Sequence, residues 1–178
     1  LNLSVGQVRR LVHSELELSA GVIAGTVHLQ TDGFTGHLHR LDSFYLPGNS
    51  LASLTGIDSA ILYIGGGLYE RIGEFYVRRF DRSLPLGPVR QVHGEPPMRR
   101  EVFMTCDPQT PASRIMTGIS WSDPGGWSSW PPHEHEKYLE EAYFYFDMPE
   151  PQFGLHLSYL DPGRIDTVHV VHSGDCVV

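Results

Sequence analysis

The chain has 178 residues and a formal net charge of −8 at pH 7. Hydrophobic residues make up 40% of it, enough to build a core, whereas its 19 glycines and 13 prolines leave little room for long helices. The acidic balance offers no basic stripe for nucleic acid or anionic membranes, and no apolar run is long enough to span a bilayer. We therefore expect a globular protein that binds neither nucleic acid nor membranes.

The N-terminal third of the chain has the pattern of short strands separated by turns. Apolar residues alternate or form brief runs over 16–29, 44–46, 51–54 and 60–64. The three glycines at 65–67 are expected to form a turn that closes this unit, because no phosphate-binding sequence follows them. Strands at such spacing are typical of small sandwiches and barrels, so we predict a first domain over 1–67.

A change in composition follows the first domain. Residues 68–100 hold most of the arginines and several prolines, which predicts a solvated basic linker with one short strand or helix near 70–79. An interface arm is the alternative interpretation of this linker. Further apolar runs between 101 and 171 predict a second β domain over 101–178 and therefore a duplicated small-barrel architecture.

The termini and the two cysteines lead to expectations about truncation of the chain and about its cellular compartment. The chain ends in apolar residues at 176–178, which resemble the middle of a strand, so we expect the second barrel to be truncated there. No signal peptide is visible, and two cysteines, Cys106 and Cys176, are too few for a disulfide scaffold. We therefore expect a reducing, cytoplasmic setting with two structural thiols.

The densest group of chemistry-bearing side chains lies in GWSSWPPHEHEKYLEEAYFYF, residues 126–146. His133 and His135 are separated by one residue, so on a strand both imidazoles would point to the same face and could bind one ion. Glu141 opens the strongly β run after them, and an antiparallel neighbour would bring its carboxylate beside the imidazoles. Two histidines and a carboxylate suit a divalent transition metal such as Zn²⁺, Mn²⁺ or Fe²⁺. The alternative interpretation is a polar hairpin tip with exposed histidines.

The period-2 alternation of a strand predicts which residues share a face with the ligating carboxylate, but it does not choose between two glutamates. Glu140 competes with Glu141 for the metal, and adjacent strand residues point to opposite faces, so only one of them should bind it. If Glu141 faces the metal, Tyr143 and Tyr145 share its face. A second His-x-His motif, His37 and His39, is followed by no suitably spaced glutamate, so we expect the N-terminal barrel to hold no metal.

The motif and the residues around it resemble those of a known protein family. GGWSSWPPHEH (125–135) followed by LEEAYFYF (139–146) is similar to the bicupin family that contains 5-deoxy-glucuronate isomerase and 5-keto-4-deoxyuronate isomerase. The match is close over 114–178, whereas the N-terminal half resembles the family only in strand rhythm and in DSFYLPGNS (42–50). The resemblance implies an all-β fold of two cupin-like small β-barrels (a bicupin), the second truncated at its C-terminus.

The resemblance also implies the metal ligands. It assigns His133, His135 and Glu141 as ligands, with Glu140 as the alternative carboxylate. Zinc or manganese is the implied metal, with iron less favoured. The family completes its set with a further histidine beyond the end of this chain, so we assign neither His169 nor His172 to that role.

The implied function is a metal-dependent aldose–ketose isomerase, an intramolecular oxidoreductase that acts on a deoxy uronic acid. The expected reaction converts 5-deoxy-glucuronate to 2-deoxy-5-keto-gluconate in myo-inositol catabolism. A 5-keto-4-deoxyuronate isomerase is the alternative within this class, and an iron dioxygenase or a non-catalytic sugar-binding cupin are alternatives from other classes. The partner is then a small sugar acid, and exposed strand edges with the Arg-rich linker favour a homo-oligomer.

The remaining parts of such a site are assigned only weakly by the sequence. Isomerisation requires a base that moves a proton between adjacent carbons, and Tyr143 and Tyr145 are weak candidates for which core packing is the stronger interpretation. Trp127 and Trp130 are expected either to wall the sugar pocket or to pack under the following proline loop. The cation for the substrate carboxylate is not assignable.

Overall fold

The computed structural model describes residues 1–133, 135, 139–161 and 163–178. This part of the chain is all β, as predicted, and no helix in it has the length and apolar character needed to cross a membrane. Packing divides the chain into two compact units, unit 1 (Leu1–Pro132) and unit 2 (His133–Val178). The division falls inside the predicted domain 101–178, and the predicted linker 68–100 lies within unit 1. Both cysteines are free.

Unit 1 contains a five-stranded antiparallel sheet in the order β1-β8-β3-β6-β9. Its central strand, β3 (Leu16–Ala24), pairs with β8 (Ala60–Leu68) on one side and with β6 (Ser43–Leu46) on the other. The edge strands are β1 (Asn2–Leu3) and β9 (Tyr76–Arg78). Strand β9 lies in the segment 70–79, where a short strand or helix was expected.

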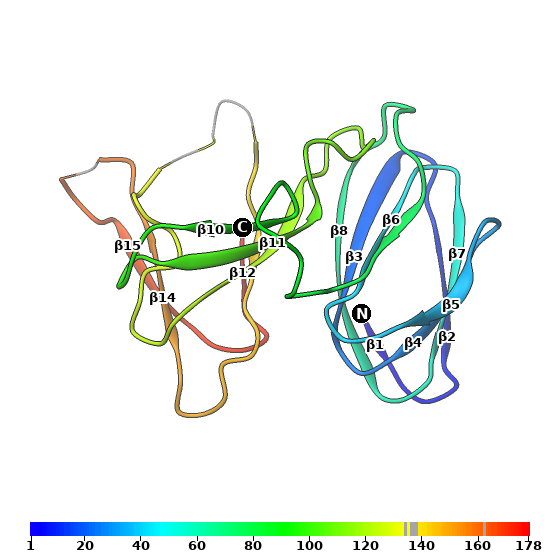
Figure 1. Cartoon of the computed structure of the whole chain (residues 1–178), viewed down its shortest axis with the longest axis horizontal. Helices are drawn as coiled ribbons and strands as arrows, with labels where there is room; N and C mark the ends of the chain where they lie inside the picture. Colours follow the sequence, from blue (N-terminus) through cyan, green and yellow to red (C-terminus); the bar gives the residue numbers. More distant parts are fainter. Residues whose placement is uncertain (134, 136–138, 162) are drawn as a thin grey trace. The chain divides into compact units, whose positions relative to one another are not determined.

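A four-stranded antiparallel sheet in the order β2-β7-β4-β5 faces the first sheet (Figure 1). Its strands are β2 (Val8–Val12), β7 (Leu51–Gly56), β4 (Val27–Gln30) and β5 (Thr35–Leu38). Burial alternates along β7, so one face of this sheet is apolar and inward while the other meets solvent.

The hydrophobic core of unit 1 lies between these two sheets. It is formed by small and branched side chains from seven strands with a single large aromatic ring: Leu3, Ala20, Val22, Val27, Leu29, Leu38, Phe44, Leu46, Ala52, Leu54, Ala60 and Leu62. Each strand contributes alternate residues, because successive side chains point to opposite faces. Two packed antiparallel sheets of short strands correspond to the double-sheet arrangement of cupin-like folds.

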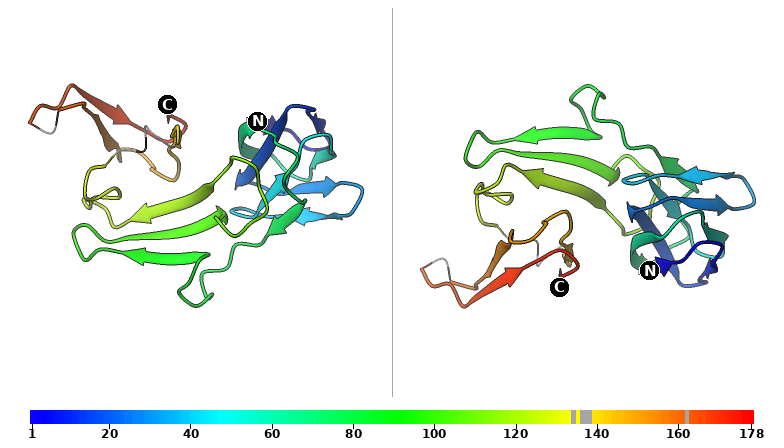
Figure 2. Two further views of the ribbon diagram at one scale, coloured as in Figure 1. Left: turned by 90° about the horizontal axis from the view of Figure 1, so that it is seen from above. Right: turned by 90° about the horizontal axis from the view of Figure 1, so that it is seen from below.

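A third sheet of unit 1 has the order β10-β11-β12 and is seen from both sides in Figure 2. Its strands are β10 (Arg90–His93), β11 (Arg100–Cys106) and β12 (Thr117–Ser122). Phe103 of β11 is fully buried and meets the ring of Phe80 edge-on at 4.9 Å.

The arginines of 68–100 do not form the solvated connector that the sequence predicted. Four of them pair with buried carboxylates of unit 1: Arg78 with Asp107 at 2.9 Å, Arg79 with Asp42 at 2.6 Å, and Arg82 and Arg90 with Glu101 at 3.2 and 2.7 Å. A buried carboxylate is costly unless a cation and hydrogen bonds compensate it. The arginines therefore attach this segment to the sheets that it crosses.

The glycine run 65–67 was wrongly predicted as a turn. These residues continue β8 and pair with Glu17, Leu18 and Ser19 of β3. A Cβ on Gly67 would lie 3.0 Å from a side-chain carbon of Ile115, so the missing side chain allows the chain at 113–115 to approach the sheet.

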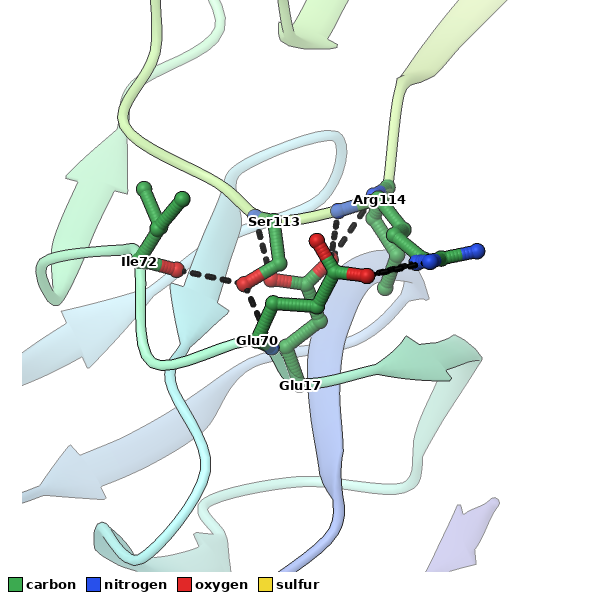
Figure 3. A network of polar contacts seen from close by, with 6 residues as sticks. Glu17, Glu70, Ile72, Ser113 and Arg114 are labelled. Atoms are coloured by element: carbon green, nitrogen blue, oxygen red, sulfur yellow. Dashed lines mark hydrogen bonds and ion pairs between the residues drawn. The ribbon is translucent and has the colours of Figure 1, made fainter.

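That approach is held by one buried carboxylate, Glu17 (Figure 3). Glu17 accepts backbone N–H hydrogen bonds from Ser113 at 2.7 Å, from Arg114 at 2.5 Å and from Ile115 at 2.8 Å. Nearby, Glu70 pairs with the Arg114 guanidinium at the surface, and the hydroxyl of Ser113 donates to the carbonyl of Ile72. Residues 113–115 thus take their position from the N-terminal sheet.

Unit 2 is built from two antiparallel strand pairs. Strand β13 (Tyr143–Phe144) pairs with β16 (Cys176–Val177), and β14 (Gly154–Ser158) pairs with β15 (Thr167–Val171). The pairing of β13 extends past its end, because Tyr145 donates its N–H to Asp175 and accepts one from Gly174.

Candidate functional site

The two histidines of the His-x-His motif lie close together at the start of unit 2. Neither His133 nor His135 lies within a strand, so the strand geometry assumed in the sequence argument does not apply. Their rings nevertheless meet edge-to-face, with centroids 4.9 Å apart. His133 is exposed, and the side chain of His135 is 35% exposed. Two imidazoles are therefore adjacent at the molecular surface.

Glu141 is the carboxylate that the structure places beside His135. The Leu139 N–H donates to the His135 carbonyl at 2.8 Å, so Leu139, two residues before Glu141, lies next to His135. Glu141 Oε1 then lies 3.6 Å from His135 Nε2. The alternative carboxylate, Glu140, is exposed.

The residues after Glu141 alternate as the period-2 argument predicted. The hydroxyl of Tyr143 donates to Glu141 Oε2 at 3.0 Å, and the rings of Tyr143 and Tyr145 stack with centroids 6.4 Å apart. Phe144 and Phe146 stack on one another separately, with centroids 6.2 Å apart. The carboxylate and both tyrosines therefore share one face, and the phenylalanines occupy the other.

His156 belongs to this cluster and was missed by the sequence analysis. It lies on β14, where its Nδ1 is 2.6 Å from the hydroxyl oxygen of Tyr145. Its ring also meets the ring of Tyr143 at 5.3 Å, and His169 lies opposite it on β15 with its ring 6.4 Å away. A signal was present, because period-2 alternation in 154–158 separates His156 from the apolar Leu155 and Leu157.

Burial changes the proton affinities of this pair. Desolvation lowers the pKa of His156, the neighbouring His169 lowers it further, and the negative charge of Glu141 opposes both. Burial also raises the pKa of the Tyr145 phenol. At neutral pH the pair therefore consists of a neutral imidazole and a neutral phenol.

The predicted pocket tryptophans lie in unit 1. The rings of Trp127 and Trp130 are 5.5 Å apart, and each side chain is just under half exposed. Their loop is held by the Trp127 N–H, which donates to the Pro97 carbonyl, and by Arg100, which donates to the Ser128 carbonyl. Their role as walls of a sugar pocket stays a prediction.

The donor set can be compared with what a transition metal requires. Two ligand atoms on a tetrahedral zinc ion lie about 3.3 Å apart when each bond is about 2.0–2.1 Å long. The 3.6 Å between His135 Nε2 and Glu141 Oε1 is close to this separation. Within the described residues no three His, Cys, Asp or Glu side chains converge as a complete metal group. The described side chains therefore supply two donor atoms at a separation compatible with a metal, on His135 and Glu141, and the ring of His133 lies next to that of His135.

The fold and this cluster together define a class of protein: an all-β, cupin-like chain with a His-x-His and glutamate surface site. Comparison with known sequences gives the family. The KduI/IolB family profile matches residues 1–178, and the chain belongs to this family.

Two relatives with similar sequences have the same protein name. The chain is 29% identical over 148 residues to a protein of Geobacillus thermodenitrificans named 5-deoxy-glucuronate isomerase, a match that covers 76% of this chain and 50% of the relative. A protein of Bacillus licheniformis with the same name is 30% identical over 79 residues, covering 40% of this chain and 29% of the relative. The chain thus spans about half the length of the first of these relatives.

A solved structure shows the same fold. An IolB-like protein from Salmonella typhimurium LT2 superposes with a TM-score of 0.82 at 19% sequence identity, covering 99% of this chain and 72% of that chain. The similarity extends over both units and supports the cupin-like fold.

Proposed function

We propose that His133, His135 and Glu141 hold a divalent transition metal, zinc or manganese in preference to iron. The observation that carries this proposal is the 3.6 Å separation of His135 Nε2 and Glu141 Oε1, with the His133 ring against His135. Imidazole nitrogen and carboxylate oxygen are the donors that these metals accept in open sites.

The reaction that we propose is the interconversion of an aldose-type deoxy uronic acid and its ketose. The substrate is 5-deoxy-glucuronate and the product 2-deoxy-5-keto-gluconate, a step of myo-inositol breakdown. Membership of the KduI/IolB family and the names of the relatives support this choice. A bound metal supplies polarisation of the carbonyl and stabilisation of negative charge on oxygen.

The residues around the carboxylate have separate roles in this proposal. Tyr143 orients Glu141 through the 3.0 Å hydrogen bond to Oε2, which leaves Oε1 directed toward His135. A hydrogen bond to a ligating carboxylate fixes its orientation and tunes its affinity for metal. The open positions on the ion are left for the oxygens of the sugar acid.

A direct assay tests the proposed function. The metal content of the purified protein is measured first, and each candidate substrate, 5-deoxy-glucuronate and 5-keto-4-deoxyuronate, is then followed by proton NMR. We expect conversion of 5-deoxy-glucuronate by the metal-loaded protein. Conversion of 5-keto-4-deoxyuronate alone would correct the substrate, and conversion of neither would contradict the isomerase function.

A further inference from the structure

The hydroxyl of Tyr145 and the imidazole of His156 form a short hydrogen bond in unit 2. The two polar atoms are 2.6 Å apart, and both side chains are partly buried. Tyr145 is held by backbone hydrogen bonds to 174–175, and His156 is held in the β14–β15 ladder opposite His169. Two paired segments thus fix the positions of the phenol and the imidazole independently.

The pair lies next to Tyr143, the residue that contacts the proposed metal ligand Glu141. Tyr143 connects the two groups: its hydroxyl donates to Glu141, and its ring meets the edge of His156 at 5.3 Å. The groups that face His156 are Tyr143 and Tyr145 on and after β13, His169 on β15 and, through its charge, Glu141. A small sugar acid held at Glu141 can therefore reach the neighbourhood of this imidazole.

We propose, resting on the proposed function, that His156 is the base that carries the proton between the two adjacent carbons, and that Tyr145 is its positioning residue. The hydrogen bond with Tyr145 holds Nδ1, and the Nδ1–H tautomer, with Tyr145 as acceptor, leaves the Nε2 lone pair free for the substrate. Which nitrogen of a histidine carries the proton is set by the partner of the other nitrogen.

The proposed isomerisation step conserves both protons and electrons. The C–H bond on the carbon next to the carbonyl breaks, its proton moves to Nε2, and its electron pair forms the C=C bond of an enediolate. The hydroxyl proton passes to the former carbonyl oxygen through water. The same Nε2 proton then returns to the neighbouring carbon, a new carbonyl forms, and His156 is neutral again, so no external oxidant or reductant is required.

The tyrosines are poorer bases than His156. The hydroxyl of Tyr143 already donates to Glu141, and burial raises the pKa of Tyr145, so neither phenol is prepared to accept a proton at neutral pH. The imidazole is neutral at that pH because its pKa is lowered by desolvation and by His169. His156 is therefore in the protonation state that a base requires.

The kinetic test uses the variants His156→Gln and Tyr145→Phe, with His172→Gln as the matched control. His172 lies in the turn after β15, where its N–H and ring face Asp175, and it has no part in the cluster. We expect His156→Gln to lower kcat about 100-fold or more with unchanged metal content, Tyr145→Phe to lower it about fivefold, and His172→Gln to leave it unchanged. An active His156→Gln protein would overturn the assignment.

The pH profile separates a positioning role of Tyr145 from a packing role. In the wild type the acidic limb of kcat/KM should lie below the ordinary histidine pKa of 6.5. In Tyr145→Phe the Nδ1–H of His156 loses its hydrogen-bond acceptor, which disfavours the charged imidazolium and lowers the pKa of His156. The acidic limb of kcat/KM of this variant should therefore move to lower pH. A limb that moves to higher pH would overturn the proposed tautomer and with it the base.

A nitrogen NMR spectrum of the labelled wild-type protein adds a readout that needs neither turnover nor a variant. We expect neutral His156 to carry its proton on Nδ1, and a proton on Nε2 would overturn the inference even if no substrate were converted. A wild type inactive on both uronates would contradict the proposed function itself. An active wild type with an equally active His156→Gln protein would contradict the base alone.

Discussion

The hydroxyl of Tyr45 donates to Glu17 Oε2 over 2.5 Å, and both side chains are completely buried in unit 1. Burial raises the pKa of Tyr45, and the hydrogen bond to Glu17 and its negative charge raise it further, so the phenol remains a donor throughout the range in which proteins are stable. Glu17 meets three backbone N–H groups of 113–115 with the same carboxylate. One side chain thus joins strand β3, strand β6 and the segment before β12.

We expect Glu17→Gln to destabilise unit 1 strongly. A single amide oxygen cannot accept from all of these donors, and the new NH₂ group faces backbone N–H groups, so the free energy of unfolding should fall by at least about 3 kcal/mol. Urea denaturation followed by circular dichroism measures this change.

Glu70→Gln is the matched control for that variant. Glu70 and Arg114 form an ion pair in which both side chains are about half exposed, 47% and 56%. Exposed pairs contribute less than about 1 kcal/mol, so this variant should be nearly as stable as the wild type. Equal losses in both variants would contradict a special role of Glu17.

We expect Gly73→Ala to disturb the same buried hydroxyl. Gly73 has a φ of +139°, and a Cβ built on it would collide with the hydroxyl oxygen of Tyr45. Strain and overpacking together should lower the melting temperature and cost about 2–3 kcal/mol. Gly33→Ala, where no atom lies within 4 Å of the added carbon, should change stability by less than about 1 kcal/mol. A tolerant Gly73 would show that Tyr45 can move without loss.

The buried carboxylate of Glu101 should make stability depend on pH. Burial alone would raise the pKa of Glu101, but hydrogen bonds and charges from Arg90 and Arg82 outweigh it, so the folded pKa lies below the ordinary value of 4.5. A depressed carboxyl pKa stabilises the fold above the unfolded value, and this stability is lost as the pH falls through the folded pKa. We expect the free energy of unfolding to fall steadily below about pH 4.5.

The variant Glu101→Gln isolates this contribution. It should be less stable than the wild type at neutral pH, because two arginines lose their carboxylate partner. Its stability should also decline less steeply than that of the wild type as the solution is acidified, which denaturation curves at several pH values would measure. Parallel declines would assign the acid sensitivity to other carboxylates.

We expect Glu141→Gln and Glu140→Gln to differ in metal binding. Changes to groups that merely surround metal ligands lower affinity 10- to 100-fold, so loss of the Glu141 carboxylate should lower it by at least about 100-fold. Glu140→Gln should retain the metal, since Glu141 is the carboxylate whose Oε1 lies 3.6 Å from His135 Nε2, and Glu140 is exposed. Elemental mass spectrometry after dialysis measures both, and the reverse order would show that the wrong glutamate has been chosen.

The local sequence pattern was sufficient to predict strands of the fold and the side chains that share one face of the candidate site. The runs at 51–54 and 60–64 predict β7 and β8, because apolar alternation with turn residues between runs is a local property. The same period places Glu141 with Tyr143 and Tyr145. The glycine run 65–67 misled the prediction, since glycine marks a close approach of another segment as readily as it marks a turn.

The sequence by itself therefore determined the all-β class, the family motif and the common face of Glu141, Tyr143 and Tyr145. Only the tertiary structure decided that His156 meets Tyr145 and that Glu17 accepts from residues 96 to 98 positions away. The first kind of relationship follows from the two-residue repeat of a strand, which every strand obeys. The second depends on strand register and on the path of the loops, which are set by the packing of the whole unit. These features produce no periodic pattern in the sequence.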